Sequence, residues 1–63
     1  MKTYTSKELI EIVKKAGWYL VRTKGSHHTF KHPIKKGSVT IPHPNNDLPI
    51  KTISSILKQA GLK

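Results

Sequence analysis

Residues 18–42 read WYLVRTKGSHHTFKHPIKKGSVTIP, and this stretch decides the fold. Its first part, residues 18–23, is rich in aromatic and β-branched side chains and has a glycine beyond each end, which is typical of a strand. Two more strands are predicted over residues 27–32 and 38–41, because each run is short and is followed directly by proline. Short turns join the three runs, so we predict a three-stranded antiparallel meander.

Helical patterns lie on both sides of the predicted meander. Upstream, Thr5 and Glu8 have the spacing of a capping box, in which each side chain accepts a hydrogen bond from a free amide at a helix start. Apolar residues then recur at helical spacing as far as Ala16, and Gly17 is suited to end the helix. We therefore predict a helix over residues 6–16.

Downstream of the meander, residues 43–47 contain a proline and two asparagines, the second of them Asn46, which predicts a loop. Asp47 is predicted to cap a second helix, with Pro49 in its first turn, and apolar residues then share one helix face. The predicted fold class is α+β, in the order α-β-β-β-α. Two helices cover only one face of so small a sheet, so we expect the other face to be open.

Length and charge restrict what this sequence does. A chain of 63 residues forms one domain, residues 1–63, that is too small for a deep pocket, so an active site is expected on an open face. Lys and Arg number 12 against 3 Asp and Glu, a net charge of +9 that favours nucleic acid as a partner. The lack of cysteine excludes disulfides and thiolate metal sites. No apolar run suits a signal peptide or membrane span, so a cytoplasmic protein with no membrane partner is expected.

Three of the four histidines, His27, His28 and His32, lie within six residues. The ordinary pKa of histidine is close to neutral, so an imidazole can accept a proton and return it at pH 7. RNA cleavage requires a base that removes the proton of the 2'-hydroxyl, and cations that stabilise charge on the phosphoryl oxygens. The segment is therefore a candidate site for this chemistry, with His27 and His28 as the candidate catalytic residues.

Alternation along the second predicted strand separates the two neighbouring histidines. If Phe30 points to the core, His28 shares its side and His27 faces outward, which favours His27 as the catalytic residue. A bulge at Gly25 would reverse this order. A metal site built from the histidines is the alternative, but adjacent strand residues point to opposite faces and no carboxylate stands nearby. We expect no metal and no cofactor.

Residues around the predicted turns are candidates for RNA binding. The set comprises Arg22, Lys24, Gly25, Ser26, Lys31, Lys35 and Lys36. The cations can hold phosphates on either side of a scissile bond, whereas Gly25 either supplies a positive φ for a turn or lets a phosphate approach backbone amides. A run of charge that is simply solvated is the structural alternative. Taken together, the set predicts a basic rim around the histidines.

The chain resembles the HicA mRNA interferases, which are toxins of bacterial toxin–antitoxin modules. The resemblance extends from Ser6 to Leu62 and depends on the order and spacing of several short motifs. These motifs are Ala16-Gly17-Trp18, Gly25-Ser26-His27, His32-Pro33, Thr40-Ile41-Pro42-His43, Asp47-Leu48-Pro49 and Leu57-Lys58-Gln59-Ala60-Gly61-Leu62.

The resemblance implies the α-β-β-β-α fold of double-stranded-RNA-binding domains, and ribosome-independent cleavage of mRNA. It also implies a HicB-type antitoxin that covers the active site, and a catalytic histidine in the Gly-Ser-His element. Gly25, Ser26 and His27 match that element directly, but the family's histidine can also align with His28, and the choice stays open here. From basicity and fold alone, a non-catalytic RNA-binding module remains the alternative.

Overall fold

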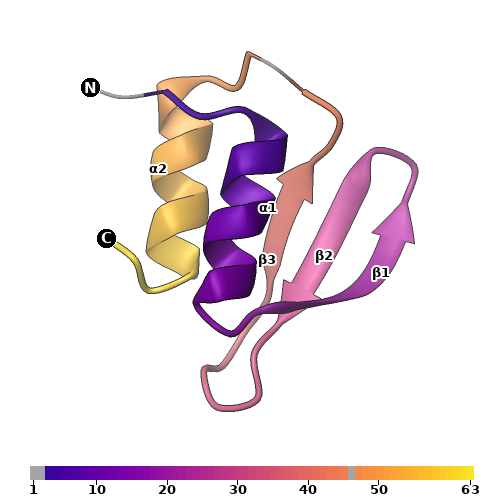
Figure 1. The fold of residues 1–63 in the computed structure, drawn as a ribbon, viewed down its shortest axis with the longest axis vertical. Coiled ribbons are helices and arrows are strands. Elements are labelled where there is room, and N and C mark those ends of the chain that lie inside the picture. Colours follow the sequence, from indigo (N-terminus) through magenta and orange to yellow (C-terminus); the bar gives the residue numbers. More distant parts are fainter. Residues whose placement is uncertain (1–2, 46) are drawn as a thin grey trace.

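The chain forms two helices and three strands in the order α1, β1, β2, β3, α2 (Figure 1). Their bounds are Ser6–Lys15 for α1, Tyr19–Lys24 for β1, His27–Lys31 for β2, Val39–Pro42 for β3 and Ile50–Gln59 for α2. The computed structural model describes residues 3–45 and 47–63, so Asn46 of the predicted loop lies outside the described residues. The predicted order of elements is confirmed.

The first helix begins and ends as predicted. The backbone N–H of Thr5 donates to Oε1 of Glu8 at 2.9 Å, and the N–H of Glu8 donates to Oγ1 of Thr5 at 3.2 Å, which completes the capping box. Ala16 is the C-cap, and Gly17 follows with a φ of 101°, a conformation that side chains with a Cβ rarely adopt. The chain can therefore turn sharply into the sheet.

The predicted cap of the second helix is wrong. Pro49 is the N-cap of α2 and forms no side-chain capping bond, and Asp47 lies two residues earlier in the loop. The N–H of Asp47 donates to Oδ1 of Asn45 at 2.9 Å, which is a local turn. Leu48 lies between Asp47 and Pro49 and is buried in the core. The helix starts after it, at Ile50.

The three strands form one antiparallel sheet in the order β1, β2, β3. A bulge lies in β1 at Val21, because Leu20 pairs with Phe30 whereas Arg22 pairs with the adjacent Thr29. The irregularity therefore falls in the first strand and not at Gly25, and side chains alternate regularly along β2. This regularity is what determines the faces of the two histidines.

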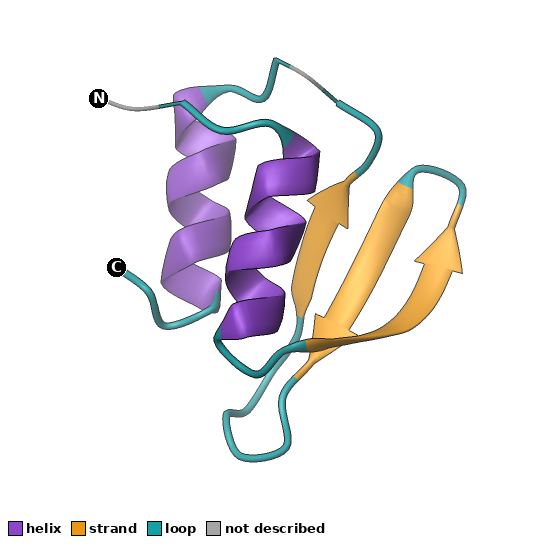
Figure 2. Ribbon diagram, viewed as in Figure 1, coloured by secondary structure: helices purple, strands orange, loops and turns teal. Residues whose placement is uncertain are grey.

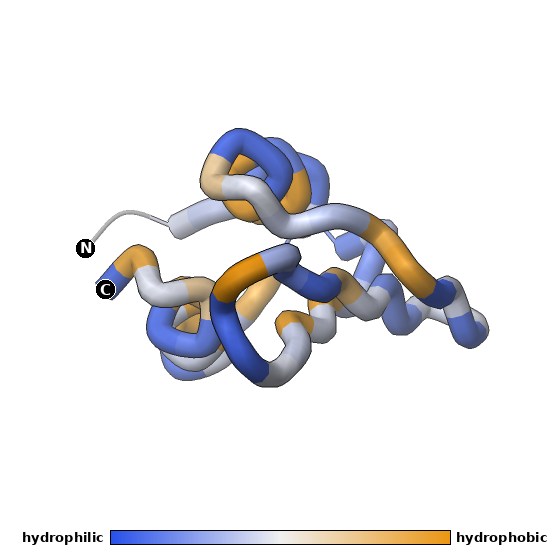
Figure 3. The backbone as a smooth tube through the Cα atoms, turned by 90° about the horizontal axis from the view of Figure 1, so that it is seen from below, coloured by the Kyte–Doolittle hydropathy of each residue, from blue (hydrophilic) through white to orange (hydrophobic). Residues whose placement is uncertain are grey.

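Both helices pack on the same face of the sheet, chiefly against β3, Phe30 of β2 is buried in the core with them, and β1 extends beyond (Figures 1 and 2). The core is made of Leu9, Val13, Trp18, Phe30, Val39, Ile41, Leu48, Ile53, Ile56 and Ala60. Figure 3 shows the far end of the β1–β2 hairpin as hydrophilic. Every residue of β1 is exposed, so the predicted helix cover reaches only two of the three strands.

None of the described helices is long and apolar enough to cross a membrane.

The start of β1 and the end of β2 each differ by one residue from the prediction, because the aromatic ring at that position packs outside the sheet. Trp18 is in the core, only 2% exposed, and its Nε1–H donates to the carbonyl of Ala60 at 3.2 Å, so β1 starts at Tyr19. His32 leaves the ladder, so β2 ends at Lys31. The His32 ring lies edge-on to Trp18, with centroids 5.2 Å apart. These two rings join the start of β1 to the end of β2.

Hydrogen bonds hold His32 in a single orientation. Its Nδ1 lies 3.0 Å from the backbone nitrogens of both Ile34 and Lys35, and its Nε2 lies 3.1 Å from the carbonyl oxygen of Ala16. Both partners of Nδ1 are donors, so Nδ1 accepts and Nε2 carries the proton that is donated to Ala16. His32 is therefore a structural residue that ties the β2–β3 connection to the end of α1.

We expect His32→Ala to lower the free energy of unfolding by about 2 kcal/mol, because it removes these hydrogen bonds and the contact with Trp18. Urea denaturation followed by circular dichroism measures the change. His32→Asn is the matched variant, since its Oδ1 can still accept from Ile34 and Lys35, and it should recover about half of the loss. Equal losses in the two variants would contradict the role assigned to Nδ1.

Candidate nucleic-acid interface and histidine site

The histidine pair follows a tight turn at the tip of the β1–β2 hairpin. Gly25 has a φ of 57°, and a Cβ placed there would meet no other atom within 4 Å, so the turn needs its backbone freedom and not its small size. Ser26 is exposed, and its carbonyl accepts a hydrogen bond from the N–H of His43 at 2.6 Å. This bond continues the β2–β3 pairing by one position beyond the strands.

The two histidines lie on opposite faces of the sheet, as alternation predicted. His27 is exposed and pairs with Lys24 on one side and Pro42 on the other. His28 is half-buried and pairs with Ile41, whose side chain is in the core. Phe30 is buried on the same side as His28. The outward histidine is thus free to meet solvent, and the inward one lies at the margin of the helix-covered face.

His28 contacts another histidine, which sequence reasoning considered only as a metal donor. The rings of His28 and His43 meet edge to face, with centroids 5.1 Å apart and planes at 88°. The contact follows from the register: Ile41 is opposite His28, so His43 is its diagonal neighbour on the same face. Nδ1 of His28 is buried and has no hydrogen-bond partner among the described residues.

His43 is in turn held by the first residue of α1. Its Nδ1 lies 2.7 Å from Oγ of Ser6, which is only 1% exposed. The same oxygen accepts the N–H of Asn45 at 2.9 Å, and the N–H of Ser6 donates to the carbonyl of Asn45 at 2.9 Å. With one lone pair of Ser6 occupied by Asn45, the hydroxyl keeps its proton and one further lone pair, so it can donate to Nδ1 of His43 or accept from it, according to the tautomer of the ring.

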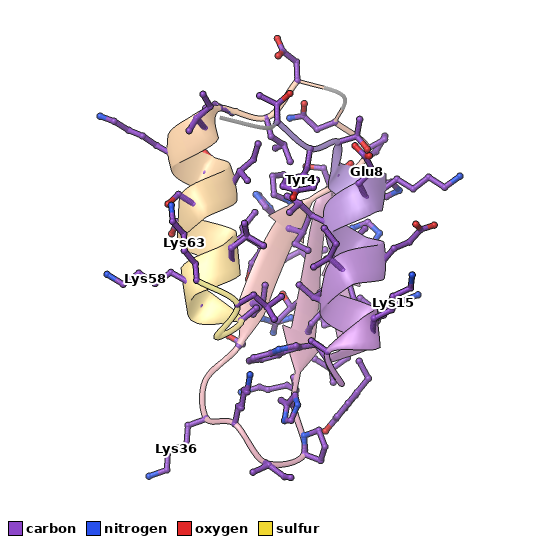
Figure 4. The ribbon with its side chains drawn as sticks, turned by 60° about the vertical axis from the view of Figure 1, so that its left-hand side comes forward. Tyr4, Glu8, Lys15, Lys36, Lys58 and Lys63 are labelled. Carbon is purple, nitrogen blue, oxygen red and sulfur yellow. The ribbon has the colours of Figure 1, made fainter. Side chains whose placement is uncertain are left out.

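The predicted cations divide into three groups. Arg22, Lys24 and Lys31 are exposed, and their cross-strand partners place them on the face of the β1–β2 hairpin that carries His27. Lys36 projects from the β2–β3 loop at the far end of the molecule (Figure 4). Lys35 has a structural partner, since its Nζ donates to the carbonyl of Ala60 at the end of α2 at 3.2 Å. The first group forms the basic hairpin face.

Two of the three carboxylates lie on α1 and share a surface depression. The surface depression that the structure shows is on the outer side of α1 and is lined by Tyr4, Glu8, Glu11, Ile12 and Lys15, so it holds two of the three carboxylates. Tyr4 and Glu8 lie close together there (Figure 4). No group of three potential metal ligands comes together in residues 3–45 and 47–63. The candidate site therefore consists of imidazoles, hydroxyls and cations.

An α-β-β-β-α chain with both helices on one face of an antiparallel meander has the architecture of double-stranded-RNA-binding domains, and this fold class is the one predicted. A family model described as HicA toxin of bacterial toxin-antitoxin matches residues 6–62. The chain belongs to the HicA toxin family.

Two solved structures show the same fold. A chain from the "Toxin-Antitoxin complex from Streptococcus pneumoniae" is 33% identical, with a TM-score of 0.77, and the match covers 95% of this chain and 100% of that one. A chain from the "HicA3 and HicB3 toxin-antitoxin complex" is 30% identical, with a TM-score of 0.74, over 95% of this chain and 97% of that one. No curated protein sequence matches this chain.

Proposed function

We propose that this HicA-family chain is an endoribonuclease that cuts mRNA without the ribosome, and that an imidazole of the pair His27 and His28 transfers the proton. The observation that carries the proposal is the position of the pair beside the hairpin turn, with His27 on the basic hairpin face and His28 on the opposite face. An extended single strand can reach an open tip, whereas a small substrate needs an enclosing pocket. The proposed substrate places the activity in the cytoplasm.

The residues support a simple sequence of proton transfers. The imidazole takes the proton of a 2'-hydroxyl, and the resulting alkoxide attacks the adjacent phosphorus. Lys24, next to the turn, stabilises the charge that develops on the phosphoryl oxygens, and Arg22 and Lys31, farther along the basic hairpin face, hold the flanking RNA backbone. The bond from phosphorus to the 5'-oxygen then breaks, and the leaving oxygen takes up a proton. Gly25 and Ser26 keep the turn open to the RNA backbone.

We infer that a HicB-type antitoxin neutralises the chain by covering the histidine pair and the basic hairpin face. A net charge of +9 favours an acidic partner surface, and one of the similar structures is a complex of HicA3 with HicB3. An antitoxin that bound this chain and left RNA cleavage intact would contradict covering of the site.

The test of the proposed function is cleavage by the purified chain. We expect it to cut a labelled single-stranded RNA in buffer with excess chelator, because imidazole and cations suffice for the reaction. Denaturing gels of the products measure the rate, and a DNA strand of the same sequence, which lacks the 2'-hydroxyl, is the control. Tight binding of RNA without cleavage would instead identify a non-catalytic RNA-binding module.

A further inference from the structure

His43 lies beside the histidine segment, and the proposed reaction gives it no role. Its ring makes two contacts: an edge-to-face contact with the ring of His28, and a hydrogen bond between Nδ1 and the buried hydroxyl of Ser6. These three residues come from different elements, namely the first turn of α1, β2 and the end of β3. A continuous line of contacts therefore joins the helix layer to the histidine pair.

We propose that His43, held by Ser6, is a positioning residue that fixes the imidazole of His28 for proton transfer. The proposal rests on the proposed RNA cleavage, and within the pair it assigns the proton transfer to His28. An acid or base acts only when its nitrogen lies within hydrogen-bond reach of the proton, so a ring free to rotate lowers the rate without weakening RNA binding.

The surroundings of the two candidate rings support this assignment. A catalytic base is normally oriented by a further group, as the acid of a triad orients its histidine. His28 has such a group in His43, and its buried Nδ1 has no hydrogen bond among the described residues that would orient the ring instead. His27 is exposed on the opposite face, where several side-chain rotamers are open to it.

The role of Ser6 follows from the hydrogen-bond inventory of a hydroxyl. Oγ accepts from Asn45, and in the proposed arrangement it donates its single proton to Nδ1 of His43, which leaves the ring's own proton on Nε2. This tautomer has a distinct signature in the ¹⁵N shifts of the ring. A wild-type His43 with its proton on Nδ1 would contradict the part assigned to Ser6.

Variants of His43 test the positioning role. His43→Asn keeps an oxygen near the position of Nδ1 for Ser6 but has no ring to meet His28. We expect it to lower kcat on a single-stranded RNA about 10- to 100-fold and to leave KM within about two-fold, because geometry is lost and binding is kept. His43→Phe keeps a ring and should recover part of kcat. His32→Asn, which alters a half-buried imidazole outside the site, is the control and should keep kcat when assayed well below its melting temperature.

Nuclear magnetic resonance of the free wild type and of folded His43→Asn supplies a readout that needs no RNA. In the wild type we expect nuclear Overhauser contacts between the ring protons of His28 and His43, and in His43→Asn we expect the His28 ring signals to move toward those of an unstructured peptide. Their absence in the wild type, or a wild-type kcat in folded His43→Asn, would overturn the proposal. A wild type with these contacts but no RNA cleavage would refute the proposed function alone and leave His43 as the residue that orients His28.

Discussion

We expect His28→Ala to lower kcat for the proposed RNA cleavage by about 10²- to 10⁴-fold, the range that general acid–base catalysis contributes. The substitution removes the imidazole that His43 holds at the margin of the helix-covered face. The fold should persist, since Ile41 and Phe30 remain in the core beside it and the backbone pairing of β2 is unchanged. Single-turnover cleavage of an RNA oligonucleotide measures the rate, and circular dichroism checks the fold.

His27→Ala is the comparison that gives this prediction its meaning. His27 faces outward beside Lys24, so its loss should act mainly on RNA binding, raising KM and lowering kcat less than about ten-fold. A loss of kcat in His27→Ala that exceeds the loss in His28→Ala would reverse the assignment within the pair. If both variants keep wild-type kcat, the histidine pair takes no part in cleavage.

We expect Phe30→Ala to remove a large part of the stability of the fold. Phe30 is 1% exposed at the centre of the core, and removal of a buried phenyl ring costs about 3–5 kcal/mol. A domain of this length has a total stability of only about 3–9 kcal/mol, at the usual value per residue. Thermal melting by circular dichroism measures the effect, and we expect the transition to shift down by 15 °C or more, at about 4–8 °C for each kcal/mol.

The matched aromatic variant is Tyr19→Ala. Tyr19 is 50% exposed at the start of β1, so its removal should change stability by less than about 1 kcal/mol. Similar melting temperatures for the two variants would mean that the sheet face under the helices is not the main source of stability. The contrast tests directly where the core lies.

Most of the fold could be predicted from sequence because local rules governed it. The capping box at Thr5 and Glu8, and the left-handed glycine after Ala16, act within a few residues and were read correctly. The errors fell where distant contacts outweighed local preference. Trp18 and His32 form their hydrogen bonds with the ends of the two helices, which shortened the predicted strands, and the burial of Leu48 displaced the start of α2.

Less of the candidate site than of the fold could be predicted from the sequence. Alternation against Phe30 placed His27 and His28 on their correct faces, since β2 has no bulge. Exposure alone then favoured His27, because nothing in the spacing of the sequence indicated that His43 would meet His28. Ser6 gave no signal beyond its place at a helix start. One clue was available: His43 lies two residues after Ile41, so pairing of Ile41 with His28 puts His43 on the same face as His28, as its diagonal neighbour.

The line of contacts from Ser6 through His43 to His28 also has a consequence for the newly made chain. Ser6 and Asn45 are joined across almost two thirds of the sequence, and contacts of such long range form late in folding. A growing chain that ends before residue 43 contains His28 but has no ring to orient it. On the proposed mechanism the toxin therefore has no complete site throughout most of its own synthesis, and only the nearly finished polypeptide could cleave the messenger from which it is translated.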